Sequence, residues 1–510
     1  SAEQSERFLW DLRRTHAEMV AECYYAELRD LAQKHGLRLL AEPYGAGPGA
    51  YDELQIGRTV DVPMGEFWAH FPWDDMMSIR LAASAAHVNG KKIVAGEAFT
   101  STEEQSRFMD HPFGLKATGD LAFSLGLNRM YFHRFAHQPH PTATPGMTMG
   151  PWGFNFDRNN TWFDQSRGWL EYLARCQFML QQGTFVADVL YFTGEGSPRA
   201  SKKIVPEIPG NFQFDAIDAE VLIKQARVEQ GRIQLNDGGS YRLLVLPPDL
   251  KSMTPATLRK LHELVHAGAT LLGSRPQYSP TLTASAADEK AFEAMADELW
   301  RDASANTPAR VGRGQVFTEL KIGQVLTRMN TIPDFEFLAT RGDAALVWLH
   351  RRTKDAEIYF VANRQRREEE VLCQFRVVGL QPEIWRPETG TIERPAVFEF
   401  SRSRTRLPLK LKPAESVFIV FRSPAMKGVA SIVRDGKPVT VTNPQVFRER
   451  SVAGVIQATN SFTISAWIRP DTDLMSIPQE GGNVAENGKS WVLSALEGDR
   501  HFGSNSGGVG

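Results

Sequence analysis

Short apolar segments that end in a glutamate recur three times within the first hundred residues. The segments are residues 37–45, 59–68 and 91–100, and their glutamates are Glu42, Glu66 and Glu97. Each segment has the length and composition of a buried strand. Repeated strands of this kind, separated by helices, favour a parallel sheet, in which the carboxyl ends of the strands meet at one edge. We therefore expect the three carboxylates to surround one pocket.

Helical patterns separate and follow these strands. Apolar residues recur at helical spacing over residues 6–35 and again over 76–89, and a helix over 162–182 closes the series. Residues 128–139 read as a fourth strand that ends in histidines. Four such units make half of a (β/α)8 barrel, whose functional side chains sit at the carboxyl ends of its strands. The pattern predicts the C-terminal half of a barrel, and we expect its first four units to precede Ser1.

The remainder of the chain divides by its periodicity. Residues 187–194, 242–247, 255–267 and 269–273 read as strand, strand, helix and strand, which is typical of a doubly wound α/β domain of the flavodoxin or glutamine-amidotransferase type. Amidotransferase chemistry needs a nucleophilic cysteine, and none lies between Cys176 and Cys373. We therefore predict that this domain is non-catalytic.

Beyond residue 336 the pattern changes to strict alternation, as over residues 344–350 and 357–363, which favours a β-sandwich. Residues 462–470 look like one strand of a laminin-G or concanavalin-like jelly roll. The predicted fold class is therefore α/β and β multidomain. Its boundaries are 1–183 for the half barrel, 184–335 for the α/β domain, 336–424 for the β-sandwich and 425–510 for an incomplete β-rich domain.

Composition narrows the class of partner. The 510 residues are 42% hydrophobic and 23% charged, with a formal net charge of -2, so no overall field attracts nucleic acid or an anionic membrane. The three cysteines, Cys23, Cys176 and Cys373, show no metal-ligand spacing. No apolar run is long enough to span a bilayer.

The glutamates suggest hydrolysis of a glycosidic bond, which normally uses two carboxyl groups supplied from different strand ends. Glu97 is the sharpest candidate because an otherwise apolar strand would not carry a charge without a purpose. Glu66 has the same context and is the candidate second carboxylate. Glu42 is equally well placed, although a glutamate at a strand end can simply accept hydrogen bonds from loop amides.

Aromatic and histidine side chains accompany the glutamates. Trp68 follows Glu66 and could form a stacking wall for a sugar face. His133 and His137 are candidates for contacts to sugar hydroxyls, with a structural role left open. Trp152 lies in a long loop of Gly, Pro, Asn and aromatic residues, which could be a saccharide-binding lid or a seal for the barrel end.

Five motifs carry a resemblance to a known family. They are Ala-Glu-Pro-Tyr-Gly at 41–45, Pro-Met-Gly-Glu-Phe-Trp at 63–68, Gly-Glu-Ala-Phe-Thr-Ser at 96–101, Phe-His-Arg-Phe-Ala-His-Gln-Pro at 132–139 and Pro-Gly-Met-Thr-Met-Gly-Pro-Trp-Gly at 145–153. In this order they resemble the α-L-rhamnosidases of glycoside hydrolase family 106. The resemblance implies an inverting exo-enzyme that removes terminal rhamnose from plant polysaccharides or glycosides.

The same resemblance implies roles for particular residues. Glu97 would be the general base, Glu66 and Glu42 would contact sugar or calcium, and the metal ligands stay unassigned. A calcium ion in the active site and a secreted, periplasmic or cell-surface location in a bacterium are implied in the same way. The general acid would end the fourth strand, upstream of Ser1, so we expect the 510-residue chain alone to be inactive.

Two other functions remain open at the level of sequence. A retaining β-galactosidase-like enzyme also combines a barrel with an amidotransferase-like domain and a β-sandwich. A non-catalytic carbohydrate-binding protein would suit an incomplete barrel followed by lectin-like strands. The separation of the carboxyl groups distinguishes inverting from retaining enzymes.

Overall fold

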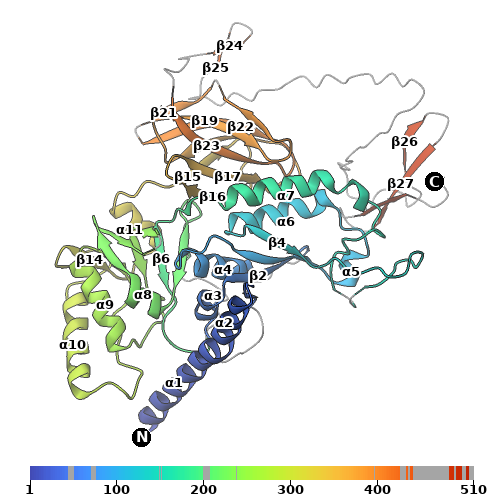
Figure 1. Cartoon of the computed structure of the whole chain (residues 1–510). Helices are drawn as coiled ribbons and strands as arrows, with labels where there is room; N and C mark the ends of the chain where they lie inside the picture. The colour runs from blue at the N-terminus through green and yellow to red at the C-terminus, as the bar shows by residue number, and fades with distance from the viewer. Residues whose placement is uncertain are drawn as a thin grey trace.

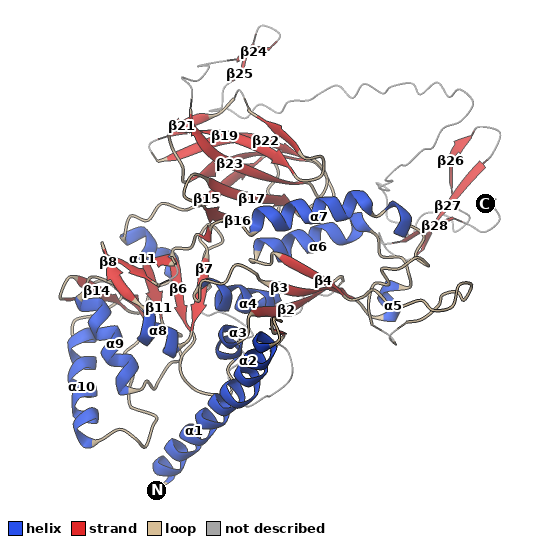
Figure 2. Cartoon of the chain, viewed as in Figure 1, coloured by secondary structure: helices blue, strands red, loops and turns tan. Residues whose placement is uncertain are grey.

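The computed structural model describes residues 1–43, 51–70, 76–148, 150, 152–198, 207–236, 238–395, 397–401 and 403–425, with short strands between 432 and 504 (Figure 1). The described elements form three groups along the chain. The first is a parallel sheet with helices, the second is a larger sheet with helices, and the third is a pair of antiparallel sheets. Figure 2 shows the helices gathered around the first two groups.

The first sheet contains four parallel strands that follow one another in space in the order of the sequence. They are β1 (Leu40–Ala41), β2 (Val62–Trp68), β3 (Ala95–Thr100) and β4 (Arg129–Phe132). The accompanying helices are α1 (Ala2–Met19), η1 (Val20–Ala26), α2 (Glu27–Lys34), α3 (Glu53–Thr59), α4 (Met77–His87), α5 (Glu103–Ser106), α6 (Pro112–Ser124), η3 (Phe163–Gln165) and α7 (Arg167–Leu180). The predicted strand and helix alternation is present, with shorter strands than expected.

An aromatic cluster fixes α7 against this sheet. The ring of Phe132 on β4 stacks on Trp169 of α7, with centroids 5.1 Å apart and planes 9° from parallel. Phe99 of β3 and Phe154 lie against the same tryptophan at 5.7 and 6.2 Å. Burial of large aromatic rings contributes strongly to core stability, so the strand ends on this sheet are held on a rigid base.

The second sheet is doubly wound. Its strand order is β13-β14-β12-β11-β6-β7, and all strands except β13 are parallel. If the parallel strands are numbered along the chain from β6, their order from the β7 edge is 2-1-3-4-5, as in flavodoxin-like folds. The strands are β6 (Val189–Phe192), β7 (Phe214–Ile217), β11 (Leu243–Val245), β12 (Thr270–Leu272), β13 (Ala309–Val311) and β14 (Gly314–Phe317). Its helices are α8 (Ala219–Gln225), α9 (Pro255–His266), α10 (Ala286–Trp300) and α11 (Ile322–Arg328), and a small antiparallel sheet holds β8 (Arg227–Glu229), β9 (Arg232–Gln234) and β10 (Ser240–Tyr241).

The third group is a pair of antiparallel sheets, ordered β15-β18-β22-β21 and β20-β19-β23-β17-β16-β5. The strands are β5 (Thr184–Phe185), β15 (Phe335–Ala339), β16 (Leu346–Arg352), β17 (Glu357–Asn363), β18 (Glu369–Phe375), β19 (Leu380–Arg386), β20 (Thr391–Glu393), β21 (Glu399–Ser401), β22 (Arg404–Leu411) and β23 (Ser416–Pro424). Alternate side chains of β22 are buried, which is the pattern expected of a strand with one face in the core.

Polar contacts join the three groups. Ser84 of α4 accepts a hydrogen bond from the backbone N–H of Ala216 on β7 at 2.9 Å. Lys116 of α6 donates to Ser416 Oγ of β23 at 3.0 Å and to Asp120 at 2.9 Å. These groups are buried, and the bonds from Ala216 to Ser84 and from Lys116 to Ser416 join one group to the next.

The structure differs from the sequence prediction at several places. Thr184 and Phe185 pair with Arg352 and Arg351 of β16, so they extend the sandwich sheet and do not start the α/β unit. The strand β7 and the sheet β8–β10 were not predicted.

Residues 462–470, predicted as a jelly-roll strand, lie outside the described residues. Beyond residue 425 the structure describes only β24 (Ile432–Arg434), β25 (Lys437–Val439), β26 (Gly482–Glu486), β27 (Ser490–Leu496) and β28 (His501–Ser504). None of the described helices has the length and apolar character needed to cross a bilayer.

Candidate active site

Three glutamates meet at the carboxyl edge of the four-stranded sheet. Glu66 on β2 and Glu97 on β3 are direct partners in the strand register, and Glu42 follows the last residue of β1. One carboxylate oxygen from each of the three lies within 4.8 Å of the others. The expectation that consecutive strands gather these carboxylates in one place agrees with this geometry.

Helix packing explains the glycine that precedes two of the glutamates. A Cβ at Gly65 would stand 2.6 Å from the carbonyl carbon of Ser78, and one at Gly96 would stand 2.2 Å from Leu127 Cδ1. Ser78 also donates to the backbone oxygen of Glu66 at 2.8 Å and accepts from its N–H at 3.1 Å. The glycines therefore allow β2 to lie close to the backbone of α4 and β3 to lie close to the Leu127 side chain.

The environment favours the neutral form of two of the carboxyls. Burial raises the pKa of Glu42 to about 8, with the charges of Glu66 and Glu97 adding to the effect. Burial also raises the pKa of Glu66, against the hydrogen bond from Trp68. Across the described ranges no lysine or arginine forms an ion pair with any of the three, so no cationic side chain compensates these carboxyls when they ionise.

Glu97 has its own polar partners. Thr100 Oγ1, at the end of the same strand, donates to Glu97 Oε1 at 2.6 Å. His133 Nδ1 lies 3.7 Å from the same oxygen and has no hydrogen-bond partner. Burial lowers the pKa of His133, opposed by the nearby Glu97, so a neutral imidazole faces the carboxylate. Glu97 is thus oriented by neutral groups and keeps one oxygen available.

Two tryptophans stand beside the cluster. The indole N–H of Trp68 donates to Glu66 Oε1 at 3.4 Å. Trp152 meets Trp68 edge to face, with centroids 5.6 Å apart, and Trp152 itself is 46% exposed. These two tryptophans, the aromatic corner of the site, offer an apolar surface next to the carboxylates, which suits a sugar ring with one apolar face.

The structure places one predicted residue apart from the glutamates and brings two further residues to them. His137 is exposed in the loop after β4, and no hydrogen bond or ion pair joins it to the glutamates in the described part of the chain. Thr100 and Ser78 were not singled out from the sequence, because hydroxyl side chains near a strand end carry no distinguishing pattern.

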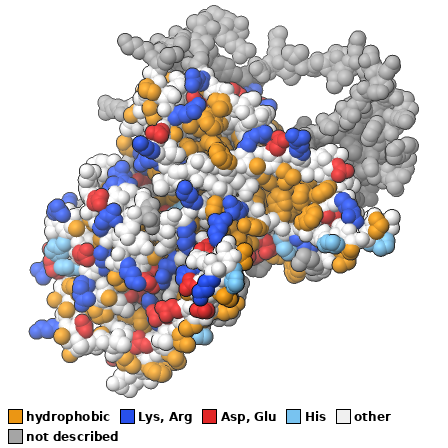
Figure 3. Space-filling model, viewed as in Figure 1, with side chains coloured by type: hydrophobic (Ala, Val, Ile, Leu, Met, Phe, Trp, Pro, Cys, Tyr) orange, Lys and Arg blue, Asp and Glu red, His pale blue; other side chains and the backbone are white. Residues whose placement is uncertain are grey.

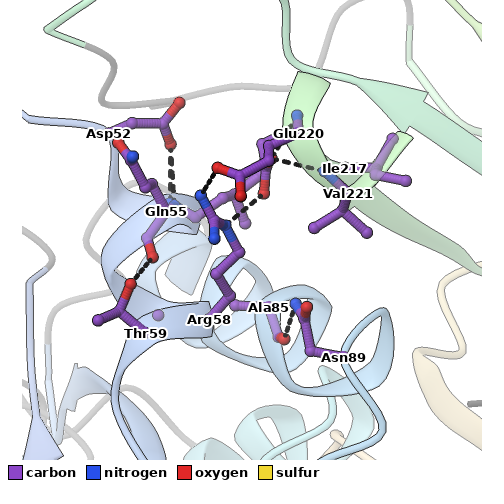
Figure 4. Close-up of polar contacts among 12 residues, drawn as sticks. Asp52, Gln55, Arg58, Thr59, Ala85, Asn89, Ile217, Glu220 and Val221 are labelled. Atoms are coloured by element: carbon purple, nitrogen blue, oxygen red, sulfur yellow. Dashed lines mark hydrogen bonds and ion pairs between the residues drawn. The ribbon is translucent and has the colours of Figure 1, made fainter. Parts of the chain in front are cut away.

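The corresponding edge of the α/β sheet is closed. Glu195, after β6, accepts hydrogen bonds from Thr254 N–H at 2.7 Å, Thr254 Oγ1 at 2.6 Å and Thr257 Oγ1 at 2.7 Å, which caps α9. Figure 4 shows the guanidinium of Arg58 pointing at Glu220 of α8. Carboxylates here are satisfied by hydroxyls, amides and a guanidinium, and the space between these residues holds only about 10 Å³.

Known proteins share this architecture. The glycoside hydrolase family 106 model, described as alpha-L-rhamnosidase, matches residues 1–399. A Formosa agariphila protein named "Putative beta-glucuronidase" is 39% identical over 426 residues, covering 83% of this chain and 34% of that protein.

Solved structures give the same picture. A rhamnosidase from Novosphingobium sp. PP1Y superposes with a TM-score of 0.78 at 32% identity, covering 85% of this chain and 42% of that one. An exo-carrageenase of the GH42 type from Bacteroides ovatus gives a TM-score of 0.52 at 11% identity, covering 81% and 56%. A mutant GH42 beta-galactosidase from G. stearothermophilus gives 0.51 at 12% identity, covering 81% and 68%. The two GH42 matches show similarity of fold alone, and the chain spans less than half the length of the first two relatives.

Proposed function

Because the chain belongs to glycoside hydrolase family 106, the alpha-L-rhamnosidases, we propose that its carboxylate cluster binds and hydrolyses a terminal α-L-rhamnoside. The single observation that carries the proposal is the meeting of Glu42, Glu66 and Glu97 within 4.8 Å at a strand-end edge with no cationic partner among the described residues. We also propose that the four-stranded sheet is the C-terminal half of a (β/α)8 barrel. Its sequential parallel order supports that assignment.

Glu97 is the proposed general base. In an inverting reaction the base removes a proton from water as the water attacks the anomeric carbon, while an acid protonates the departing oxygen. Thr100 donates to one oxygen of Glu97, and the neutral His133 faces the same oxygen at 3.7 Å. These contacts orient a base that can still accept a proton.

The spacing argues for a different role for Glu66. Inverting acid and base carboxyls stand ~6.5–9.5 Å apart, so that a water fits between them and the sugar. Oxygens of Glu66 and Glu97 lie within 4.8 Å, which is closer than such a pair requires. We assign the general acid to a carboxyl outside this cluster, and Glu66 and Glu42 to substrate or cation binding.

The cluster suits a calcium ion. Calcium takes carboxylate oxygens as ligands, and Glu42 and Glu66 provide two of them beside the proposed base Glu97. Burial raises the pKa values of Glu42 and Glu66, with the nearby like charges adding to the effect, and a bound ion would favour their ionised forms. When bound, such an ion would supply a fixed positive charge that orients sugar hydroxyls. Trp68 and Trp152 would hold the apolar face of the ring beside it.

A neutral sugar fits this site better than a uronic acid. The relative from Formosa agariphila carries the name of a beta-glucuronidase, and a glucuronide brings a carboxylate of its own. No described arginine or lysine pairs with the three glutamates, so the protein supplies no cationic side chain for that carboxylate. Rhamnose carries no charge, so its binding requires no such side chain.

The proposal is tested by assaying the complete gene product against an aryl α-L-rhamnoside and an aryl β-D-glucuronide. We expect hydrolysis of the rhamnoside alone, with NMR showing that the first-formed rhamnose has the inverted anomeric configuration. Hydrolysis of the glucuronide alone would overturn the substrate assignment, and retention would overturn the mechanism. Binding of rhamnosides without hydrolysis would favour a carbohydrate-binding protein.

We further propose that the α/β unit is non-catalytic, since the carboxylates at its strand ends are already bonded within the protein. A secreted, periplasmic or cell-surface location is proposed from the class of substrate, because plant polysaccharides lie outside the cell. Fractionation of the source cells followed by immunoblotting tests the location.

A further inference from the structure

A second group of metal-ligating side chains lies far from the carboxylate edge. His262 and His266 are four residues apart on α9, and Glu298 is near the end of α10. Figure 1 shows these two helices side by side, and Figure 3 shows pale blue histidine side chains on that side of the surface. One ligand atom from each residue lies within 4.8 Å of the others. The proposed hydrolase function uses none of them.

The local geometry converges on one point. His262 Nε2 lies 2.9 Å from Glu298 Oε2, and His266 Nε2 lies 2.9 Å from Glu298 Oε1. The two imidazole rings have centroids 4.3 Å apart. Side chains four apart on a helix lie on one face, so both Nε2 atoms aim at the same carboxylate by helix geometry.

Packing holds the two helices at this distance. Leu258, Leu261, Leu264 and Val265 of α9 are buried, as are Phe292, Ala296 and Leu299 of α10. The histidines stand beside that apolar contact with their side chains 23% and 40% exposed. An ion from solvent can therefore reach the three side chains without disturbing the core.

We propose that His262, His266 and Glu298 bind a divalent transition-metal ion of the Zn²⁺ class across α9 and α10. Two imidazoles and one carboxylate are a usual ligand set for Zn²⁺, with water in the fourth position. Zinc bonds of ~2.0–2.2 Å in tetrahedral geometry place ligand atoms about 3.4 Å apart. The ligand atoms now lie within 4.8 Å of one another and would move closer together on binding the ion. Nitrogen ligands distinguish the site from a calcium site, which takes oxygens.

Binding exchanges protons for the ion. In the metal-free state the Nε2 protons are shared with the ionised Glu298, whose pKa is lowered by its hydrogen bonds to the two histidines. An incoming ion takes the Nε2 lone pairs, and the displaced protons move to solvent or to Nδ1. The ion then connects the two helices in place of the hydrogen bonds.

Calorimetric titration of the metal-free chain with Zn²⁺ at pH 7.5 tests the proposal. We expect His266→Gln and Glu298→Gln each to weaken the binding by about tenfold or more, since even the partners of metal ligands change affinity by that factor. His16→Gln, an exposed histidine on α1, is the matched control and should leave the affinity unchanged. Equal affinity in the parent and both site variants would overturn the proposal.

A second measurement uses the unaltered chain. Diethyl pyrocarbonate acylates free imidazoles, so Zn²⁺ should protect His262 and His266, but not His16, in peptide mass spectra. Equal modification with and without Zn²⁺ would also overturn the site. Because neither experiment measures hydrolysis, its outcome is independent of the rhamnosidase proposal.

Discussion

The two parallel sheets of this chain end in carboxylates that have opposite surroundings. At the four-stranded sheet, Glu42 and Glu66 have raised pKa values and face Glu97 with no lysine or arginine paired to them in the described ranges. At the six-stranded sheet, Glu195 accepts three hydrogen bonds. Burying a charged group costs free energy unless the group is paired or hydrogen-bonded. Of the two edges, the first is therefore the one where this cost is not offset within the protein.

This difference separates function from architecture. Both sheets present their strand ends in the way that ligand-binding α/β folds do. The satisfied edge gains stability from its carboxylates, whereas the unsatisfied edge is suited to an external ligand. Four predictions test the contrast.

The largest expected effect is on catalysis. Glu97→Gln in the complete gene product should lower kcat for an aryl α-L-rhamnoside by about 10²–10⁴-fold, because loss of a general base removes that much. Steady-state kinetics measures the change. Glu195→Gln is the matched control and should keep kcat within about twofold. An equal fall in kcat in the two variants would contradict the assignment of catalysis to the first edge alone.

For the free energy of unfolding, we expect the opposite ranking of the same two variants. Glu195→Gln should lower the free energy of unfolding by about 1–3 kcal/mol, because the buried carboxylate loses bonds to Thr254 and Thr257. Urea denaturation followed by fluorescence measures this, with Glu97→Gln expected to change stability less. An unchanged Glu195→Gln midpoint would mean that the second edge is not held by its carboxylate.

Glu42 should destabilise the metal-free protein at high pH. Its folded pKa of about 8 exceeds the ordinary value of 4.5, so the unfolded chain ionises first. The stability that Glu42 contributes is present below pH 4.5 and is lost as the pH rises towards 8. Glu42→Gln should therefore raise the unfolding free energy by about 1–2 kcal/mol at pH 8 and change it little at pH 4.5. Chemical denaturation at both pH values, with metal removed, gives the answer. A Glu42→Gln variant less stable at pH 8 would contradict the electrostatic description.

The smallest effect concerns the aromatic corner. Trp152→Ala should raise KM for the rhamnoside by about fivefold with little change in kcat, since a stacking surface contributes about 1 kcal/mol to binding. Phe178→Ala, an exposed aromatic residue on α7, is the control and should leave both constants unchanged. A fall in kcat at constant KM would assign Trp152 to the chemistry itself.

Sequence alone anticipated the strand-end glutamates because an apolar strand that ends in Glu is a periodic, local signal. It also anticipated β17, whose bounds agree with the alternating pattern over residues 357–363. It missed β5, since two residues show no periodicity, and their pairing with β16 is set by a partner about 170 positions away.

Side-chain contacts between elements were beyond the same reasoning. The 3.7 Å approach of His133 Nδ1 to Glu97 Oε1, for example, depends on how β3 and the segment after β4 meet in space. The sequence analysis did not single out His262, His266 or Glu298, because Glu298 comes from a different helix and meets the histidines only in the folded chain.

The most direct test is a crystal structure of the complete gene product carrying Glu97→Gln, grown with a rhamnosyl oligosaccharide. We predict the terminal rhamnose against Trp68 and Trp152, with its anomeric carbon facing residue 97 and its hydroxyls reaching Glu42 and Glu66. A sugar bound at the strand ends near Glu195, with the glutamate cluster left without one, would contradict the account.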